Sequence, residues 1–96
     1  MNPTRPRQRP PQPDRKSTRL GVAIGQVIWT QRVHVTGESQ TDLADRIGRS
    51  QATISAWERG RHVPSWGELR LLADALGVPM ETFVRLVVQH TEPEAA

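Results

Sequence analysis

The sequence predicts an all-α domain of five helices that follows a basic N-terminal arm, and three observations support this prediction. Apolar residues recur at helical spacing in several segments of residues 18–90. Serine or threonine precedes most of these segments, where a side-chain oxygen can cap free backbone N–H groups. Glycines stand where four of the segments end, because glycine takes the left-handed backbone conformation without a Cβ clash; they are Gly37, Gly48, Gly60 and Gly77.

Composition limits the chain to one small domain. Its 96 residues, 35% of them hydrophobic, suffice for a single core and leave no room for a separate ligand-sensing domain. We find no apolar run of membrane-spanning length and no secretory segment, so we expect a cytoplasmic protein without membrane contact. No cysteine is present, which excludes disulfides and thiolate chemistry.

The basic charge is concentrated in residues 1–17, which contain five prolines and no apolar side chain after Met1. Five cations stand there against one acidic residue, whereas residues 18–96 hold eight arginines against nine acidic residues. Proline removes a backbone donor and blocks helix, so we expect a disordered arm. Such an arm is a solvated tail, a ligand for a proline-binding domain, or a cationic segment for nucleic acid. Its cations are Arg5, Arg7, Arg9, Arg15 and Lys16.

The first helix begins after a cap at Thr18 or Ser17 and runs to about Val35. Its inward stripe is predicted to contain Leu20, Ile24, Val27 and Ile28. Gly21 and Gly25 lower helix propensity, and their spacing reflects either close packing or chance.

Two short helices joined by a tight turn are predicted over residues 39–60. Ser39 and Asp42 form a capping box for the first, whose inner face carries Leu43, Ala44 and Ile47. Gly48 makes the turn and Ser50 caps the second helix. Ile54 and Trp57 point back toward the first helix, which leaves an outer face of small and polar residues: Gln51, Ala52, Ser55, Ala56 and Arg59.

A fourth helix follows the capping box of Ser65 and Glu68, with a core face of Leu69, Leu72, Ala73 and Leu76. The last helix follows Pro79 and carries the apolar residues Phe83, Val84, Leu86, Val87 and Val88, so it has more apolar surface than this small domain can cover. We therefore expect a partner subunit there, with an interface formed by Val84, Leu86, Val87 and Val88. Residues 91–96 are predicted to form a frayed tail.

No catalytic or metal-binding pattern is present in the sequence. The three histidines, at positions 34, 62 and 90, lack ligand spacing, and no nucleophile motif or phosphate loop is found, so we predict no enzyme, metal or cofactor. Trp57 is expected in the core. Trp29 and Trp66 are expected at the core rim or at an interface, and packing is favoured for both.

Residues 39–77 resemble the Cro and phage-repressor type of helix-turn-helix protein, the XRE family. The match rests on a small residue at Ala44, glycine at Gly48 and apolar residues at Ile54 and Trp57 within the motif 40–59. The resemblance implies a five-helix, lambda-repressor-like fold over residues 18–90. In that family an arginine of the first helix often pairs with the glutamate matched by Glu58. Arg32 lies one residue before the position at which the family has this arginine. Either the loop is therefore one residue longer or the salt bridge is absent.

The resemblance also implies which residues meet double-stranded DNA. Base contacts are expected from Gln51, with Ala52, Ser55 and Ala56 beside it. Phosphate contacts are expected from five residues, which position the protein without reading sequence: Gln40, Arg49, Thr53, Arg59 and Arg61.

The expected function is transcriptional regulation by a homodimer on an inverted repeat, with repression as the expected sign. Two alternatives remain open, an autoregulating antitoxin and a protein-binding module on the same scaffold. A toxin or RNA polymerase would then be the protein partner.

Overall fold

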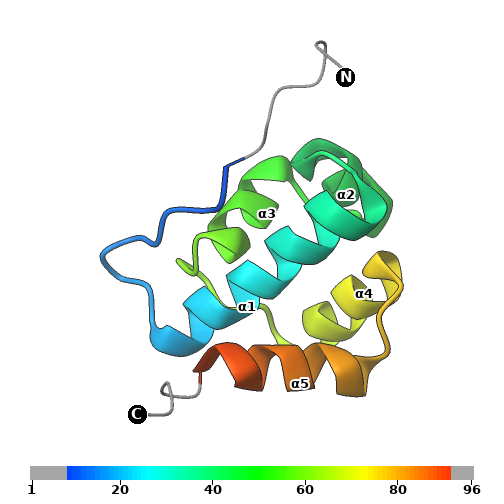
Figure 1. Cartoon of the computed structure of the whole chain (residues 1–96). Helices are drawn as coiled ribbons and strands as arrows, with labels where there is room; N and C mark the ends of the chain where they lie inside the picture. Colours follow the sequence, from blue (N-terminus) through cyan, green and yellow to red (C-terminus); the bar gives the residue numbers. More distant parts are fainter. Residues whose placement is uncertain (1–8, 92–96) are drawn as a thin grey trace.

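The computed structural model describes residues 9–91, and it is built from five α-helices and one π-helical turn without strands in that range (Figure 1). The elements are α1 (Arg19–Gln31), η1 (Arg32–Thr36), α2 (Gln40–Ile47), α3 (Gln51–Glu58), α4 (Trp66–Leu76) and α5 (Met80–Thr91). The predicted all-α, five-helix fold is therefore confirmed.

Helix α1 is capped by Thr18, whose hydroxyl accepts from the Gly21 N–H. Ile24, Val27 and Ile28 are buried as predicted. Leu20 is 50% exposed, so the prediction that it belongs to the inward stripe is wrong. It stands in the first turn of α1, before the helix passes over the core.

Helix α1 continues directly into the π-helical turn η1, which ends at Gly37 with a φ of 71°. A π-helical turn places more residues in one turn than an α-helix does, which shifts the register of the residues after it. Arg32 is the first residue of η1 and reaches Glu58 despite its early position, with Nε 2.6 Å from Oε2. Of the two alternatives left open by the sequence, the absent salt bridge is therefore wrong.

Helices α1 and α3 cross so closely that backbone meets backbone. A Cβ added at Gly25 would lie 2.2 Å from the Glu58 carbonyl oxygen, and one at Gly21 would lie 2.7 Å from that of Gly60. Gly60 in turn faces the backbone of Val22. The spacing of Gly21 and Gly25 thus reflects close packing, which holds the motif against α1.

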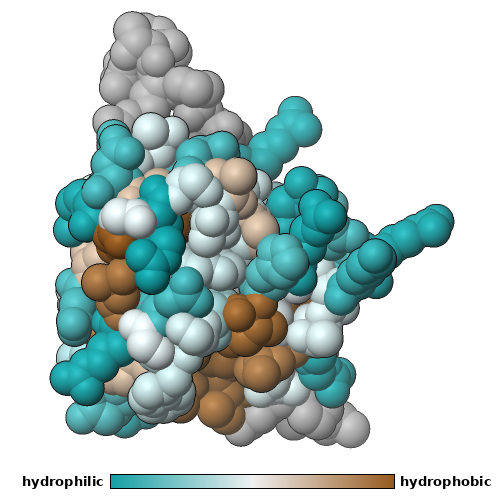
Figure 2. Space-filling view, turned by 180° about the vertical axis from the view of Figure 1, so that it is seen from behind, coloured by the Kyte–Doolittle hydropathy of each residue, from teal (hydrophilic) through white to brown (hydrophobic). Residues whose placement is uncertain are grey.

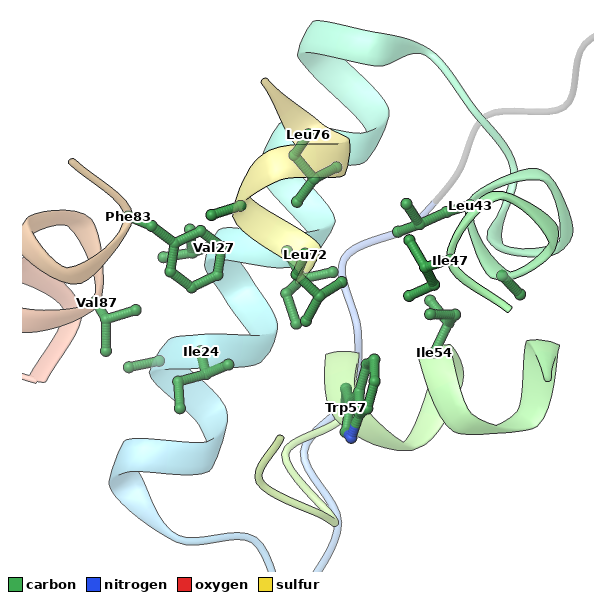
Figure 3. Packing of buried hydrophobic residues seen from close by; sticks show 14 residues of the cluster. Ile24, Val27, Leu43, Ile47, Ile54, Trp57, Leu72, Leu76, Phe83 and Val87 are labelled. Atoms are coloured by element: carbon green, nitrogen blue, oxygen red, sulfur yellow. The ribbon is translucent and has the colours of Figure 1, made fainter. Parts of the chain in front are cut away.

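One hydrophobic core joins side chains from all five helices (Figure 3). Leu43 and Ile47 of α2, Ile54 and Trp57 of α3, and Leu72 and Leu76 of α4 are buried together. Phe83 and Val87 attach α5 to α1. Leu69, predicted to face the core, packs at its edge and is partly buried.

Apolar side chains also remain at the surface, and α5 carries two of them, Val84 and Val88. Figure 2 shows hydrophobic surface gathered in the lower half of the molecule, at the level of α5 in Figure 1. Val87, however, is only 7% exposed, so it belongs to the core of its own chain and the prediction that places it in an interface needs correction. Leu86 is partly buried. Trp66 is 68% exposed, so a place at the core rim is wrong for this side chain, and a place at an interface stays a prediction.

The described residues test the predicted boundaries only in part. Residues 9–17 form no helix or strand, and the arm residues Arg5 and Arg7 lie outside the described range, as do residues 92–96. Among residues 9–91, no helix is long and apolar enough to cross a membrane, and no group of side chains is arranged to hold a metal ion.

Candidate nucleic-acid interface

The two motif helices are held by their caps and their turn. The Ser39 hydroxyl accepts from the Asp42 N–H while the Asp42 carboxylate accepts from the Ser39 N–H, which completes the predicted capping box. Gly48 has a φ of 69°, the left-handed conformation that ends α2. The Ser50 hydroxyl caps α3 by accepting from the Thr53 N–H. These contacts fix α3 relative to α2.

The outer face of α3 is polar, small and accessible. Gln51 and Ala52 are exposed, while Ser55 and Ala56 are half-buried beside them. All four predicted base contacts line one shallow groove together with Arg59 and Arg61. The short side chains leave the backbone of α3 free to approach a partner closely, and the two arginines stand at one end of the groove.

A directional chain of hydrogen bonds supports Gln51. Arg32 donates to both carboxylate oxygens of Glu58, at 2.6 and 2.9 Å. Gln40 donates from Nε2 to Glu58 Oε1 at 2.9 Å. Gln51 then donates from Nε2 to Gln40 Oε1 at 2.6 Å. We call these four residues, Arg32, Glu58, Gln40 and Gln51, the relay, because each position constrains the next.

The buried end of the relay is an ion pair, and the exposed end is an amide. The side chains of Arg32 and Glu58 are 2% and 1% exposed. A buried pair of this kind is tolerated where its hydrogen bonds are satisfied, and Arg32 also donates to the Glu38 carbonyl oxygen at 2.8 Å. Because the ion pair is rigidly seated, it is a fixed base for the two glutamines.

The predicted phosphate contacts are distributed around α3. Arg59 is exposed at its C-terminal end, and Arg61 follows in the loop, with Nε 3.8 Å from Asp14 Oδ2. Arg49, in the turn, pairs with Glu68 at 3.3 Å. Thr53 shares a hydrogen bond with Ser50 at 2.9 Å. Gln40 differs from these four, because its side chain is engaged in the relay.

Two glutamates that pair with arginines near the interface have lowered pKa values. The pKa of Glu68 is lowered, first because its carboxylate accepts from the Ser65 backbone N–H and then because of Arg49. The pKa of Glu38 is lowered by its hydrogen bonds from Arg46, which binds both carboxylate oxygens at 2.7 Å. Arg46 also donates to the Ala75 carbonyl, so this pair connects α2 to α4.

Sequence reasoning missed the contacts of the described arm. Arg9, Pro11 and Gln12 line a groove of about 550 Å³ that also contains Gln40 and Ser55. Trp29 borders the same groove, and its indole N–H is buried without a hydrogen-bond partner among the described residues. Trp29 also contacts the His34 ring edge-on. No sequence signal predicts a contact between an arm and a helix this far apart.

Comparisons with known proteins agree with this geometry. A family model described as a helix-turn-helix domain matches residues 15–86. No curated protein matches the sequence.

Three solved structures are similar. The clp gene regulator ClgR from C. glutamicum is 24% identical, with a TM-score of 0.72, covering 78% of this chain and 96% of that one. A mutant of the restriction-modification controller protein C.Esp1396I is 26% identical, with a TM-score of 0.69, covering 76% and 96%. The hypothetical transcription factor NHTF from Neisseria is 26% identical, with a TM-score of 0.63, covering 78% and 87%.

These relatives are regulators rather than enzymes, in agreement with the expectation that the chain is not an enzyme. They also confirm the resemblance to XRE-type regulators. Because the family model matches most of the chain, this protein belongs to the helix-turn-helix domain family and has the fold of DNA-binding transcription regulators.

Proposed function

We propose that this protein is a sequence-specific regulator that binds double-stranded DNA as a homodimer on an inverted repeat and represses transcription. The observation that carries the proposal is the relay, which presents Gln51 at the exposed N-terminal end of α3. An α-helix fits the major groove of B-DNA, and residues at its N-terminal end reach the base edges.

The chemistry of Gln51 favours adenine. One amide hydrogen of Gln51 is donated to Gln40, which leaves the second hydrogen and the carbonyl oxygen free for a base. Adenine offers N7 as acceptor and its N6 amino group as donor in the major groove, so a single glutamine can satisfy both. Ala52 and Ala56 are suited to thymine methyl groups at neighbouring positions.

The arginines of the motif supply the contacts that do not read sequence. Arg59 and Arg61 lie at the C-terminal end of α3, and Arg49 lies beyond its N-terminal end. Phosphates of the two strands flank a helix in the major groove, so cations at both ends suit this arrangement. In the free protein, Arg49 and Arg61 form exposed ion pairs of little energetic value. On binding DNA, they would give up these pairs for phosphate contacts.

We propose that the protein dimerises through the exposed apolar residues of α4 and α5. Trp66, Met80 and Val84 line a groove between these helices, and Val88 is exposed further along α5. A two-fold dimer of helix-turn-helix domains places its half-sites about 34 Å apart, one turn of DNA. The same surface would serve a toxin or RNA polymerase in the alternative functions.

Selection of bound sequences from random duplexes tests this function directly. We expect one preferred site, palindromic, with an A·T pair at the position read by Gln51. Sedimentation should show a dimer on that site, and Val84→Asp with Val88→Asp should weaken both dimerisation and binding. Leu20→Asp is the control, because Leu20 is equally exposed on α1. Recovery of random sequences would overturn the proposal, and a single copy on a non-repeating site would overturn the dimer.

A further inference from the structure

Two carboxylates stand beside the two ends of α3, the helix that carries the proposed base contacts. Asp14 Oδ2 lies 3.8 Å from Nε of Arg61, which follows the C-terminal end of α3. Glu68 Oε2, in the first turn of α4, lies 3.3 Å from Nε of Arg49, which precedes the N-terminal end of α3. Each arginine for which we propose a phosphate contact at these two places therefore has an anionic partner in the free protein.

Asp14 is held in place by a turn of its own backbone. Its Oδ1 accepts from the Lys16 N–H at 3.4 Å, and its backbone N–H donates to the Ser17 hydroxyl at 2.9 Å. The Ser17 hydroxyl donates in turn to the carbonyl oxygen of Arg59, the C-cap of α3, at 2.8 Å. One carboxylate oxygen of Asp14 is thus committed to the backbone, and the other lies near Arg61.

Glu68 is held in the same way by the capping box of α4. Its Oε1 accepts from the Ser65 N–H at 2.8 Å, which leaves Oε2 for Arg49. The pKa of Glu68 is lowered, first by that backbone hydrogen bond, so the carboxylate keeps its charge. Like Asp14, Glu68 is therefore a fixed anion and not a freely moving side chain.

The arginines are the more accessible members of both pairs. Their side chains are 38% exposed in Arg49 and 58% exposed in Arg61, whereas those of Glu68 and Asp14 are 26% and 25% exposed. A phosphate group that approaches α3 can therefore reach each guanidinium group, and it does so with a fixed carboxylate close by. Phosphate and carboxylate are both anions, so they compete for the same arginine.

A paired arginine also changes the ion balance of DNA binding. An unpaired cation that neutralises a phosphate releases one condensed counterion, which contributes about −0.9 to the slope of log affinity against log salt. When Arg61 leaves Asp14 for a phosphate, the carboxylate loses its partner and takes up a cation from solution. The release and the uptake offset each other, so the contact adds little to the slope. The same holds for Arg49 and Glu68.

We propose that Asp14 and Glu68 are intramolecular competitors of DNA phosphate, which hold Arg61 and Arg49 and thereby lower the affinity for every duplex, whatever its sequence. This inference rests on the proposed DNA-binding function and deepens it by naming two residues that oppose binding. The competition acts on the contacts that do not read sequence and leaves the contacts of Gln51 untouched. Total affinity then depends more heavily on the base contacts.

Variants that remove one charge and keep the backbone hydrogen bonds test the proposal. In Asp14→Asn and Glu68→Gln a side-chain oxygen can still accept from the backbone N–H, and glutamine, like glutamate, completes a capping box. Asp45→Asn is the matched control, because Asp45 is exposed on α2 and forms no ion pair within residues 9–91. Thermal melting of the full-length proteins verifies the fold. Affinity is measured over a range of salt on the selected site and on a scrambled duplex of equal length.

Asp14→Asn and Glu68→Gln should each tighten binding about two- to fivefold for each bound protomer at about 0.1 M salt, the range of an exposed ion pair. The gain should be equal on both duplexes, because no base contact changes. Each variant should steepen the salt slope by about 0.9 for each protomer, since one more counterion is released without uptake. Asp45→Asn should change neither the affinity nor the slope to this extent.

Double variants show whether the competition is local. The gain from Asp14→Asn should largely vanish in the presence of Arg61→Ala, because no arginine remains to be released, and should persist in the presence of Arg49→Ala. Glu68→Gln should show the reverse dependence. This crossed pattern separates two specific pairs from a general effect of net charge.

Three outcomes would overturn the inference and leave the proposed function intact. They are unchanged affinity and slope in both single variants, an equal gain in Asp45→Asn, and a gain that survives the loss of the paired arginine. A gain confined to the selected site would also overturn it, because base reading would then have changed. If every protein bound the two duplexes equally, the proposed sequence specificity would fail, while a gain that depends on the paired arginine would still support the competition. Absence of binding to either duplex would refute both.

Discussion

Gln51 donates its side-chain amide to Gln40 and not the reverse, and the direction of this 2.6 Å hydrogen bond follows from the ion pair beneath it. The carboxylate of Glu58 only accepts, so Gln40 must turn its NH₂ group toward it. The Gln40 oxygen then faces Gln51, which must present its own NH₂ group. The carbonyl oxygen of Gln51 is thereby left for a partner, in the orientation that adenine requires.

The first prediction concerns this coupling. Gln51→Ala should lower affinity for the selected site by about 1–3 kcal/mol and relax base preference at one symmetric pair of positions. Gln40→Ala should relax the same positions, because the Gln51 amide loses its orientation. The two changes together should cost less than their sum, which affinity measurements on single-base variants of the site would show. Full additivity would contradict the relay. Arg61→Ala is the matched control and should weaken all variants alike.

Glu58→Ala should destabilise the fold strongly. It leaves the guanidinium group of Arg32 buried at 1% exposure with its main partner removed, and breaking a buried pair in this way costs about 3–5 kcal/mol. Urea unfolding measures the change. The double variant Arg32→Met with Glu58→Leu should recover much of the loss, since two apolar side chains leave no unpaired charge. A loss below about 1 kcal/mol in Glu58→Ala would show that Arg32 reaches solvent easily.

Gly25→Ala should separate α1 from α3. Its Cβ would meet two backbone carbonyl oxygens, those of Glu58 at 2.2 Å and Trp57 at 2.6 Å, and neither can move without the helix. We expect a loss of about 3 kcal/mol in unfolding free energy, at the upper end of the usual range for overpacking.

Gly67→Ala is the matched control for that substitution. Gly67 lies in α4 and an added Cβ meets no atom within 4 Å. Alanine is the better helix former, so this change should stabilise the protein by about 0.5–1 kcal/mol. A similar loss in both variants would contradict the argument from backbone contact.

Acid should weaken the link between α2 and α4. The pKa of Glu38 is lowered by Arg46 in the folded state, so the unfolded chain binds more protons than the folded one as the pH falls. The contribution of this pair is present above the unfolded pKa of glutamate, about 4.3, and is lost as the pH falls through the lower folded value. Melting temperature against pH should therefore decline less steeply between about pH 5 and 3 in Glu38→Gln. An unchanged profile would show that the pair contributes nothing.

The sequence predicts most of the fold because the signals are local. Capping boxes at Ser39 and Ser65 and left-handed glycines at Gly48 and Gly77 depend on residues within one turn, and all are confirmed. Errors arise where the outcome depends on which elements meet. Val87 is buried because α5 packs on α1 along this residue, and periodicity cannot select one face within the continuous apolar run 86–88.

The candidate site also combines features that local sequence signals predict with contacts between distant elements that they do not predict. The outer face of α3 follows from helical spacing, and the four expected base contacts do share one groove. The relay joins three separate elements, η1, α2 and α3, and the Ser17 hydroxyl joins the arm to the end of α3 by donating to the Arg59 carbonyl oxygen. Among these contacts, the sequence analysis left open only the Arg32–Glu58 pair, through the family resemblance. Such contacts have no local signature, because each is made by side chains that are distant along the chain.

Arg32 is the first residue of the π-helical turn, so residues later in the turn can change without moving Arg32 relative to α1. Five residues, Arg32–Thr36, form this wider turn, and the Arg32 guanidinium reaches both oxygens of Glu58. Deleting one residue from this turn, such as the 65% exposed Val35, would return it toward ordinary α-helical winding. A chain that lacks Val35 should therefore keep the Arg32–Glu58 contact and the seating of α3.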